Sequence, residues 1–328
     1  MQAIKLLAAV LTCAALPVTL PASVQAAPNF PERDKPLRIF VPFAAGGGVD
    51  AAARLLGTQL QKQLGVTVIV ENKAGASGTI GGKAVQSAPA DGYTLLFSAA
   101  THVLAKQVLS NPPYDPQADF APVARVGEAP LLLVVATGKR EARLADVIGA
   151  VRQQPDKWTA GIPASGAPSH LATLLMAKQA QLKLTYVPYK GTQPALMDVA
   201  GGHTDLLLDS MISLLSMAKS GKVRPIAISS AKRSTLMPDV ATFKESGLPS
   251  FDYASWYGVW APRDTPADRI ALLNAAINTA TKELAKSGAL AGLGIEPVTE
   301  SAEQFKRFIA AGVTEGAELL KSAGFRPE

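Results

Sequence analysis

Cysteine and histidine are both scarce in this chain. Its 328 residues include one cysteine, Cys13, and three histidines, His102, His170 and His203. The histidines stand on different predicted elements, and no H-x-x-x-H or H-E-x-x-H pair occurs. A single thiol excludes an internal disulfide bond, and this histidine spacing argues against a metal centre. We therefore expect neither a metal nor another cofactor.

Charge is sparse as well. Charged residues make up 18% of the chain, and 32 Lys and Arg against 26 Asp and Glu give a formal net charge of +6. The basic residues are scattered, and no basic run with interleaved aromatic residues occurs. This pattern argues against nucleic-acid binding. The mild positive excess would instead help to attract anionic solutes.

Long apolar runs are confined to the N-terminus, where residues 1–26 have the pattern of a secretory signal peptide. Lys5 supplies the positive charge, Leu6–Leu20 is apolar but interrupted by Pro17, and Val24–Ala26 matches a small-x-small cleavage site. The apolar run is too short and too interrupted for a good membrane span. We therefore expect the chain to be exported and the signal peptide to be removed.

The remaining chain predicts an α/β fold. Roughly 300 residues are long enough for two domains. Alternating strand and helix patterns imply a largely parallel sheet with helices on both faces. The strands are predicted at Leu37–Val41, Val66–Val70, Tyr93–Phe97, Leu131–Ala136, Thr159–Ile162, Leu184–Val187, Thr204–Leu208 and Val223–Ser229. A short helix is predicted to end just before Pro89. The other helices are predicted at Asp50–Leu64, Leu144–Gln153, His170–Gln179, Gln193–Ala200, Ile212–Lys219, Ala267–Lys286 and Ala302–Ser322.

Two segments are predicted to carry the chain between domains. They are Phe120–Pro130 and Trp256–Pro262, and the αβ units between them would form a second domain. The two long C-terminal helices would return to the first. The predicted domains are residues 28–124 plus 256–328, and residues 125–255.

A triple glycine follows the first predicted strand. Gly46, Gly47 and Gly48 separate Leu37–Val41 from an Ala- and Leu-rich helical pattern. A strand, a glycine turn and a helix start place free backbone N–H groups in one concave spot, whose partial positive charge suits an anion. Glycine also lets a ligand approach closely, because no Cβ intervenes. A tight turn without any ligand is the competing interpretation.

Several segments together resemble a known family, the periplasmic solute-binding proteins of tripartite tricarboxylate transporters, also called the Bug family. The matching segments are KPLRIFVPFAAGGGVDAAARLL, VIVENKAGASGTIGGKAV, DGYTLLFSAATHVLA, IPASGAPSHLATLLM, YVPYKGTQPALMDVAGGHTDLLLD and YGVWAPRDTP, in this order along almost the whole mature chain. The resemblance implies a two-lobed, type II-like Venus-flytrap fold with a hinge between the lobes. It also implies a periplasmic, monomeric protein that captures a small organic carboxylate and delivers it to the membrane subunits of a secondary transporter.

The family pattern also implies a set of binding residues. One departure from it is the pair Ala44-Ala45, where many members have proline or serine. On the first lobe the implied contacts are Phe43, Ala44, Gly47, Gly48, Ser98 and Thr101, and on the second they are Ser165, Gly166, Ser169, His170, Tyr189, Thr192 and Asp209.

Several of these residues have a structural alternative. The hydroxyls of Ser98, Thr101 and Ser169 could cap their own helices. His170 could be a structural hydrogen-bonding group, since lone histidines usually are. Asp209 follows the end of a predicted apolar strand, where it could orient Lys190 or a water, or accept from a ligand amino or hydroxyl group. It could also simply be a turn residue.

The glycines at 75, 78, 81 and 82 raise the possibility of a nucleotide site. Their spacing gives neither a P-loop with G-K-[ST] nor G-x-G-x-x-G at the start of a helix. They are more consistent with a turn near the cleft.

Two other functions compete with solute capture for transport. An exported hydrolase could use Ser165 or Ser169 with a histidine and Asp209, but no G-x-S-x-G nucleophile elbow surrounds either serine. A sensory binding protein would present the loaded form to a membrane receptor, and its fold and pocket would be the same. We expect a binding protein and not an enzyme.

Overall fold

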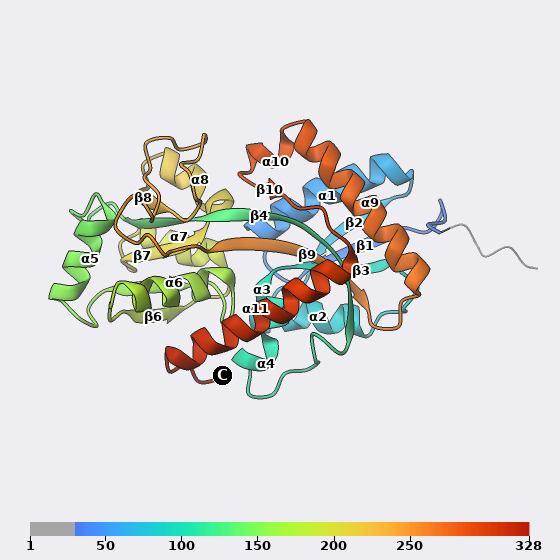
Figure 1. The fold of residues 1–328 in the computed structure, drawn as a ribbon, viewed down its shortest axis with the longest axis horizontal. Helices are drawn as coiled ribbons and strands as arrows, with labels where there is room; N and C mark the ends of the chain where they lie inside the picture. The colour runs from blue at the N-terminus through green and yellow to red at the C-terminus, as the bar shows by residue number, and fades with distance from the viewer. Residues whose placement is uncertain (1–29, 328) are drawn as a thin grey trace, which may run out of the picture. The chain divides into compact units, whose positions relative to one another are not determined.

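The computed structural model of the chain describes residues 30–327 (Figure 1). The predicted signal peptide lies outside these residues. Within them, no helix combines the length and the apolar character needed to cross a bilayer. The structure is of the mixed α/β class, as predicted.

The described strands form one ten-stranded sheet. Its main path runs β2-β1-β3-β9-β4-β7-β5-β6, and β10 and β8 each pair with β4. The strands are β1 Leu37–Val41, β2 Val68–Asn72, β3 Thr94–Ser98, β4 Phe120–Ala136, β5 Thr159–Ile162, β6 Thr185–Pro188, β7 Leu206–Ser210, β8 Val223–Ile228, β9 Ala254–Pro262 and β10 Glu296–Pro297.

Parallel pairing is confined to the two ends of this path. Strand β1 pairs in parallel with β2 and β3, and β5 pairs in parallel with β6 and β7. The central strands β4 and β9 are antiparallel to each other and to their outer neighbours β7 and β3. The sequence therefore predicted the parallel ends correctly but missed the antiparallel centre.

The two predicted crossing segments are themselves strands. Phe120–Pro130 of β4 pairs with β9, and Leu131–Val135 of the same strand continues into pairing with β7. In Figure 1 both strands extend across the middle of the sheet. We call the strands β1, β2, β3, β9 and β10, with Phe120–Pro130, the first sheet region. The strands β5 to β8, with Leu131–Ala136, are the second sheet region.

Helices flank both sheet regions. Helices α5, α9 and α11 have the predicted bounds, whereas α1 and α6 each begin two residues earlier than predicted. The helices are α1 Gly48–Leu64, α2 Thr79–Gln86, α3 Ala100–Val103, α4 Ala105–Val108, α5 Leu144–Gln153, α6 Pro168–Gln179, α7 Thr192–Ala200, α8 Met211–Lys219, α9 Ala267–Lys286, α10 Ala289–Gly292 and α11 Ala302–Ser322, with a single 3₁₀ turn η1 at Ala76–Gly78.

Strand β4 shows why the second sheet region reads as a continuous apolar run. Leu131, Leu133 and Val135 belong to a core cluster on one face, and Leu132 and Val134 belong to a second cluster on the other. Side chains alternate along a strand, so a sheet covered by helices on both faces needs apolar residues at every position.

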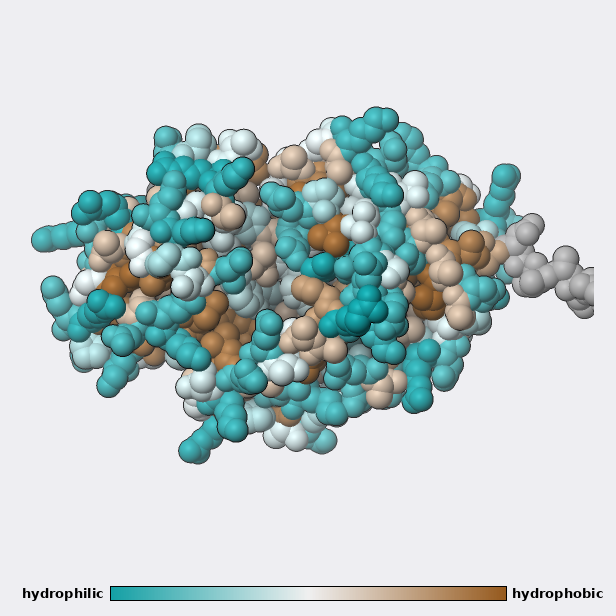
Figure 2. Space-filling model, in the orientation of Figure 1, coloured by the Kyte–Doolittle hydropathy of each residue, from teal (hydrophilic) through white to brown (hydrophobic). Residues whose placement is uncertain are grey.

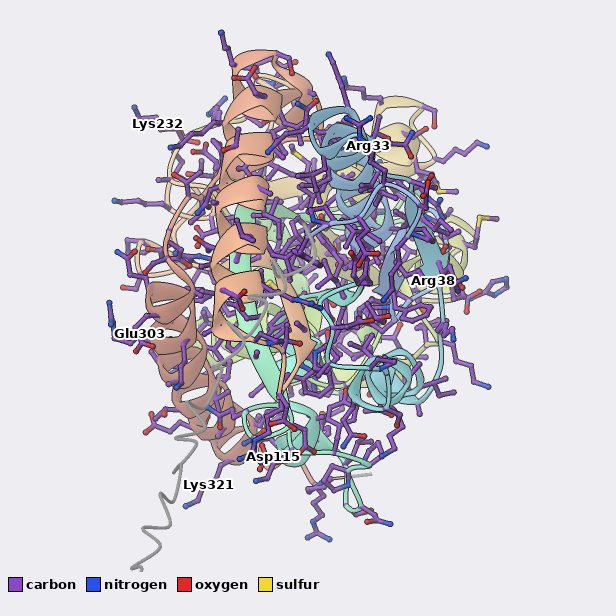
Figure 3. The ribbon with its side chains drawn as sticks, turned by 90° about the vertical axis from the view of Figure 1, so that its right-hand side faces the viewer. Arg33, Arg38, Asp115, Lys232, Glu303 and Lys321 are labelled. Atoms are coloured by element: carbon purple, nitrogen blue, oxygen red, sulfur yellow. The ribbon has the colours of Figure 1, made fainter. Side chains whose placement is uncertain are left out.

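The C-terminal helix α11 packs against β4 and extends to α6 (Figure 1). Its first turn begins with a capping box, in which Ser301 and Gln304 each bond the other's backbone N–H. Glu303 and Lys321 lie at its opposite ends (Figure 3). This placement of charge complements the helix dipole.

Candidate functional site

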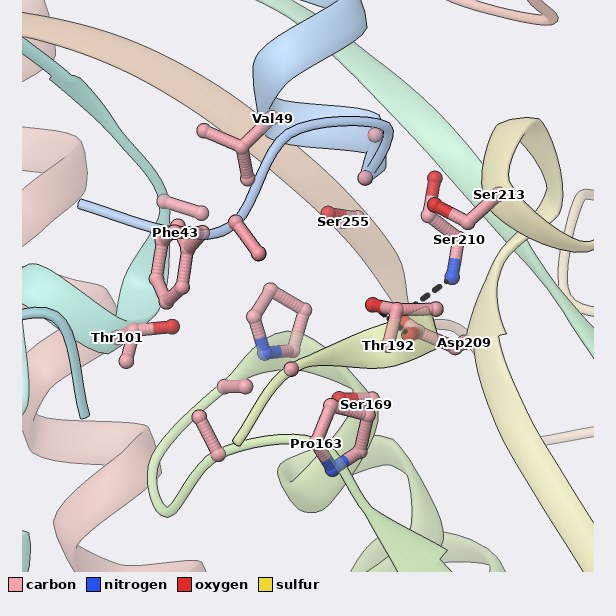
Figure 4. A pocket seen from close by; sticks show the side chains of 18 of the residues that line it. Phe43, Val49, Thr101, Pro163, Ser169, Thr192, Asp209, Ser210, Ser213 and Ser255 are labelled. Carbon is pink, nitrogen blue, oxygen red and sulfur yellow. Dashed lines mark hydrogen bonds between the residues drawn. The ribbon is translucent and has the colours of Figure 1, made fainter. Parts of the chain in front are cut away.

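A cavity lies where several strand-to-helix turns of both sheet regions meet, against one face of β9 (Figure 4). It contains about 630 Å³ of space, part of it open to solvent. The turns that line it lead from β1 into α1, from β5 into α6, from β6 into α7 and from β7 into α8.

The turn before α1 exposes backbone N–H groups to this cavity. Gly46 has a positive φ of 86°, a conformation that favours glycine. Gly47 is the N-cap, and no side chain caps the helix. The first N–H groups of a helix have no partner within the helix. Gly47 and Gly48 both line the cavity, so this helix start faces it directly.

A buried polar network holds the turn from behind. Asp50 accepts hydrogen bonds from the Gly46 N–H at 2.9 Å and from Asn72 Nδ2 at 2.8 Å. Asn72 Nδ2 also donates to the Phe43 carbonyl at 3.0 Å, and Arg54 pairs with Asp50 at 3.0 Å. Burial alone would raise the pKa of Asp50, but these bonds outweigh it and lower that pKa below the usual value.

Three further helices begin at the same cavity. Their N-caps are Ala167 for α6, Gly191 for α7 and Ser210 for α8, and none of them makes a side-chain capping bond. Four uncapped helix starts therefore converge on one space. Each contributes a partial positive charge and free N–H donors, which suit an anion.

The cavity lining includes one carboxylic acid and no Lys, Arg or His. Asp209 lies inside β7, whereas the predicted strand ended one residue before it, at Leu208. It accepts from the Thr192 hydroxyl at 2.6 Å and from the Ser210 N–H at 2.7 Å. Burial raises the pKa of Asp209 to about 6, although both of these hydrogen bonds act to lower it.

The two sheet regions touch beside Asp209. A Cβ on Gly48 would lie 2.9 Å from both Ser210 Oγ and Tyr257 Oη. Those two oxygens are themselves 3.1 Å apart, and Gln193 Nε2 donates to the Gly46 carbonyl at 3.4 Å. The α1 turn therefore packs directly against the second sheet region, and only glycine leaves room for this approach.

The structure brings eight of the thirteen predicted residues together at this cavity. They come from both sheet regions, with Phe43 and Thr101 at one side and Thr192 and Asp209 at the other (Figure 4). The eight are Phe43, Ala44, Gly47, Gly48, Thr101, Ser169, Thr192 and Asp209.

The other five, Ser98, Ser165, Gly166, His170 and Tyr189, do not line the cavity. Two of them hold the turn before α6, where His170 Nδ1 accepts from the Gly166 N–H at 3.1 Å. Tyr189 Oη bonds to Asp198 at 2.7 Å and Thr204 at 2.6 Å. The Ser98 hydroxyl is fully buried and finds no hydrogen-bond partner among the described residues.

The other twelve residues of the lining were not predicted from the sequence. Tyr257, and Ser255 just before the WYGVWAP segment, could have been found from the alternation of side chains, once this segment was recognised as part of a strand. The others carry no local motif. The missed residues are Val49, Ala99, Pro163, Ala164, Ala167, Pro168, Gly191, Gln193, Ser210, Ser213, Ser255 and Tyr257.

Residues 30–327 contain no group of three or more His, Cys, Asp or Glu side chains that could hold a metal ion. The hydrolase alternative places Asp209 beside a histidine, yet its carboxylate bonds to Thr192 and Ser210. The cavity thus offers hydrogen-bond donors and one acid, groups that suit the binding of a small ligand.

Comparison with known proteins identifies the family. The family described as tripartite tricarboxylate transporter family receptor, TctC, matches residues 52–325. Protein BugT of Bordetella pertussis is 36% identical over 300 residues, which cover 91% of each chain. Two solved structures are also similar. R. palustris Rpa4515 with adipate has a TM-score of 0.86 at 32% identity and covers 92% of this chain and 100% of its own. MatC from Rhodopseudomonas palustris with bound malate has a TM-score of 0.80 at 31% identity, over 89% of this chain and 100% of its own.

These similarities, together with that to the periplasmic binding protein BugD, confirm the predicted α/β fold of a periplasmic binding protein. They also confirm the resemblance drawn from the sequence segments. The family consists of solute-binding proteins and not of enzymes, and its members are periplasmic. The chain therefore belongs to the TctC family of tripartite tricarboxylate transporter receptors.

Proposed function

We propose that this protein is exported to the periplasm, captures a small organic carboxylate between its two lobes and delivers it to the membrane subunits of a tripartite tricarboxylate-type transporter. One observation carries the proposal: four uncapped helix N-termini meet at a cavity whose lining includes no basic side chain. Backbone dipoles favour a carboxylate without the desolvation cost of a buried ammonium or guanidinium group.

Two similar proteins support the ligand class. Rpa4515 was solved with adipate and MatC with malate, and both ligands are carboxylates. The particular acid is left to experiment.

The proposed lobes are residues 28–124 plus 256–328, and residues 125–255. Strands β4 and β9 would connect the lobes. The boundary between residues 124 and 125 falls inside β4, and the boundary between residues 255 and 256 falls near the start of β9. Ligand contacts made to both lobes would then favour the closed form by population shift.

The proposed contacts are the eight predicted residues that line the cavity, joined by Ser210 and Tyr257. Among the five outside the lining, Gly166 and His170 would act indirectly, by shaping the start of α6. The cradle around Gly47 and Gly48 would bind one carboxylate of the ligand.

A thermal-shift screen of the mature protein against mono-, di- and tricarboxylates, aromatic acids and amino acids tests this function. A ligand at a hundred times its Kd should add about 2.7 kcal/mol of stability, which is a shift of several degrees. Calorimetry on any hit then gives the Kd. A blank panel, repeated after unfolding and refolding to remove a bound ligand, would contradict the carboxylate assignment.

Gly47→Leu tests the cradle itself. A Cβ at Gly47 meets only the Ala44 carbonyl, at 3.8 Å, so the fold should survive while the side chain obstructs the helix start. We expect the affinity of the ligand found in the screen to fall about tenfold or more, equivalent to about 1.4 kcal/mol. Gly149→Leu is the matched control, because Gly149 lies in α5 with open space around it. Equal affinity in the two variants would overturn the cradle assignment.

A further inference from the structure

A second and larger cavity lies on the opposite face of β9. Ser255 and Tyr257 face the ligand cavity, whereas Ala254 and Trp256 line this second groove. This is the ordinary alternation of a strand. Helix α6 also contributes to both cavities: Ser169 lines the first cavity, and Leu171 and Leu175 line the second. The groove contains about 1440 Å³ of space, including open solvent.

Its walls come from both sheet regions. Helix α11 forms one side, and the helix α6 of the second sheet region forms the other. The two helices contact each other, and Lys178 Nζ lies 3.5 Å from Ser322 Oγ at one end. Figure 2 shows apolar side chains at the surface where α11 lies beside α6. The width of the groove therefore depends on how the two sheet regions are placed.

The chemistry of the groove is an apolar floor with an acidic rim. Val103, Leu171, Trp256, Phe308 and Leu319 supply the floor. The rim has four carboxylates, Glu128, Asp252, Glu315 and Glu318, against the single ammonium of Lys178.

Three of the rim carboxylates are available to a partner. Glu128 is already paired with Arg125 at 2.6 Å, but Asp252, Glu315 and Glu318 form no ion pair within residues 30–327. Burial, and after it the negative charge of Glu315, raises the pKa of Tyr253, which also lines the groove.

We propose that this groove is the docking site for a basic segment of the transporter's membrane subunits, with an apolar side chain of that segment seated over Trp256. The inference rests on the proposed function and extends it to the partner. Charge complementarity specifies a cationic occupant, and the apolar floor specifies an anchor, as in helix-in-groove recognition. Because both sheet regions form the walls, the closed and open forms present different grooves, and the partner can distinguish a loaded receptor from an empty one.

Gly312 provides a variant that fills the groove without disturbing the fold. It lies inside α11 and lines the groove, and a Cβ built there meets nothing within 4 Å. Gly312→Leu should also favour the helix, since glycine is a poor helix former. Gly149→Leu in α5 is the matched control, being equally free of contacts and remote from the groove. Glu315→Lys and Glu318→Lys reverse the rim charge, and Glu283→Lys on α9 is their control.

The test has two measurements on the full mature protein. Calorimetry with malate or adipate, whichever stabilises the receptor, reports ligand binding. Uptake of the same radiolabelled acid into liposomes that contain the membrane subunits reports docking. We expect every variant to keep its Kd, and Gly312→Leu and the rim reversals to lower uptake about tenfold at limiting receptor, equivalent to about 1.4 kcal/mol. The controls should keep full uptake.

A unique thiol locates the contact. The only cysteine, Cys13, lies in the predicted signal peptide, so Gly312→Cys would carry the single thiol of the mature chain. A thiol-reactive photocrosslinker there should capture a membrane subunit when carboxylate is present, and the same probe on Gly149→Cys should not.

Each outcome decides separately on the groove and on the function. Normal uptake by the groove variants, with normal ligand binding, overturns the docking site and leaves the proposed function standing. Absence of ligand binding by the wild type overturns the function itself. Binding to liposomes that lack the subunits, or self-association measured by light scattering and abolished by Gly312→Leu, would assign the groove to a lipid surface or a second copy and overturn the proposal.

Discussion

At the scale of single residues, Asp209 sets an unusual condition on ligand binding. Its carboxyl is buried in a cavity that otherwise attracts anions, and within residues 30–327 it accepts hydrogen bonds only from the Thr192 hydroxyl and the Ser210 N–H. When charged, it repels a bound carboxylate through a medium of low dielectric constant. When protonated, it is neutral and can itself donate a hydrogen bond.

The affinity for a carboxylate should therefore depend on pH. The pKa of Asp209 is raised to about 6, so between about pH 8 and pH 6 the carboxyl takes up a proton and ligand binding strengthens. We expect calorimetry to show up to about tenfold tighter binding per pH unit in this window for a ligand that stays ionised. Asp209→Asn, which keeps an oxygen acceptor, should make the profile flat. A wild-type profile that is already flat would contradict the coupling.

The same shift has a consequence for stability without ligand. The folded pKa lies above the unfolded value of 3.8, so the folded state binds the proton more tightly. The resulting stabilisation is fully present below about pH 4 and is lost as the pH rises through about 6. Asp209→Asn should remove this contribution from the dependence of Tm on pH.

At the scale of elements, the start of α6 depends on a side chain that lies outside the cavity. Pro168 occupies the first turn and no side chain caps it, but the His170 ring reaches back to the Gly166 N–H. Gly166 has a φ of 71°, and a Cβ there would lie 2.9 Å from Val108. The turn is therefore fixed by glycine geometry and by one imidazole acceptor.

His170→Phe separates these contributions. The variant keeps an aromatic ring near Phe325, whose ring centroid lies 5.3 Å away, but removes the acceptor for a buried N–H. We expect a loss of about 1–3 kcal/mol in the free energy of unfolding, measured by urea denaturation, together with weaker ligand binding. Tyr186→Phe, on the other ring neighbour of His170, is the control. A stability loss no larger than that of the control would show that the bond matters little.

Local patterns predicted those elements whose signals are complete within a short window. Helix α5 has matching bounds because its apolar period and its flanking polar residues are all local. Helices α1 and α6 begin two residues before their predicted starts because glycine and proline were assigned to the turns. Pro168 in fact occupies the first helical turn, where it costs no hydrogen bond.

The candidate site was predictable only in part, for a related reason. Phe43, Gly47 and Thr192 stand in turns with recognisable motifs, and they do line the cavity. Tyr257 lies in a strand that reads as an ordinary apolar run, and its position opposite Gly48 is set by pairing between segments roughly two hundred residues apart, a distance over which no local pattern carries information. Tyr189 followed the family pattern but turns instead toward Asp198 and Thr204.

At the scale of the whole molecule, the approach of the α1 turn to the second sheet region should control closure. Gly48 leaves no room for a Cβ, since Ser210 Oγ and Tyr257 Oη would both lie 2.9 Å from it. Of these two residues only Ser210 belongs to the second sheet region, so a methyl group at this point would push Ser210 away from the α1 turn and raise the free energy of the closed form.

Gly48→Ala should therefore favour an open form. We expect ligand affinity about tenfold weaker, and a radius of gyration by small-angle scattering that contracts less on adding ligand than in the wild type. Gly149→Ala is the control, because Gly149 lies in α5, outside the cavity lining, and its Cβ would meet nothing within 4 Å. Identical scattering and affinity in the two variants would show that this contact does not control closure.

The antiparallel centre of the sheet escaped prediction at this same scale. Phe120–Pro130, which contains two prolines, was predicted only to carry the chain between domains, but it forms the first 11 residues of the 17-residue strand β4. Proline is tolerated there because the pairing with β9 shifts register twice, next to Pro122 and again near Gly127. Such irregular pairing depends on a distant partner strand and leaves no periodic trace in the sequence.

The alternation along β9 also limits how this lineage can change. Consecutive residues face two different cavities, so losing or gaining one residue within the strand would turn Trp256 toward the ligand and Tyr257 toward the opposite groove. Substitutions in β9 can alter either cavity separately, but a change of length would damage both at once. Descendants of this gene should therefore diversify β9 by replacement and accept insertions and deletions elsewhere, in the surface turns.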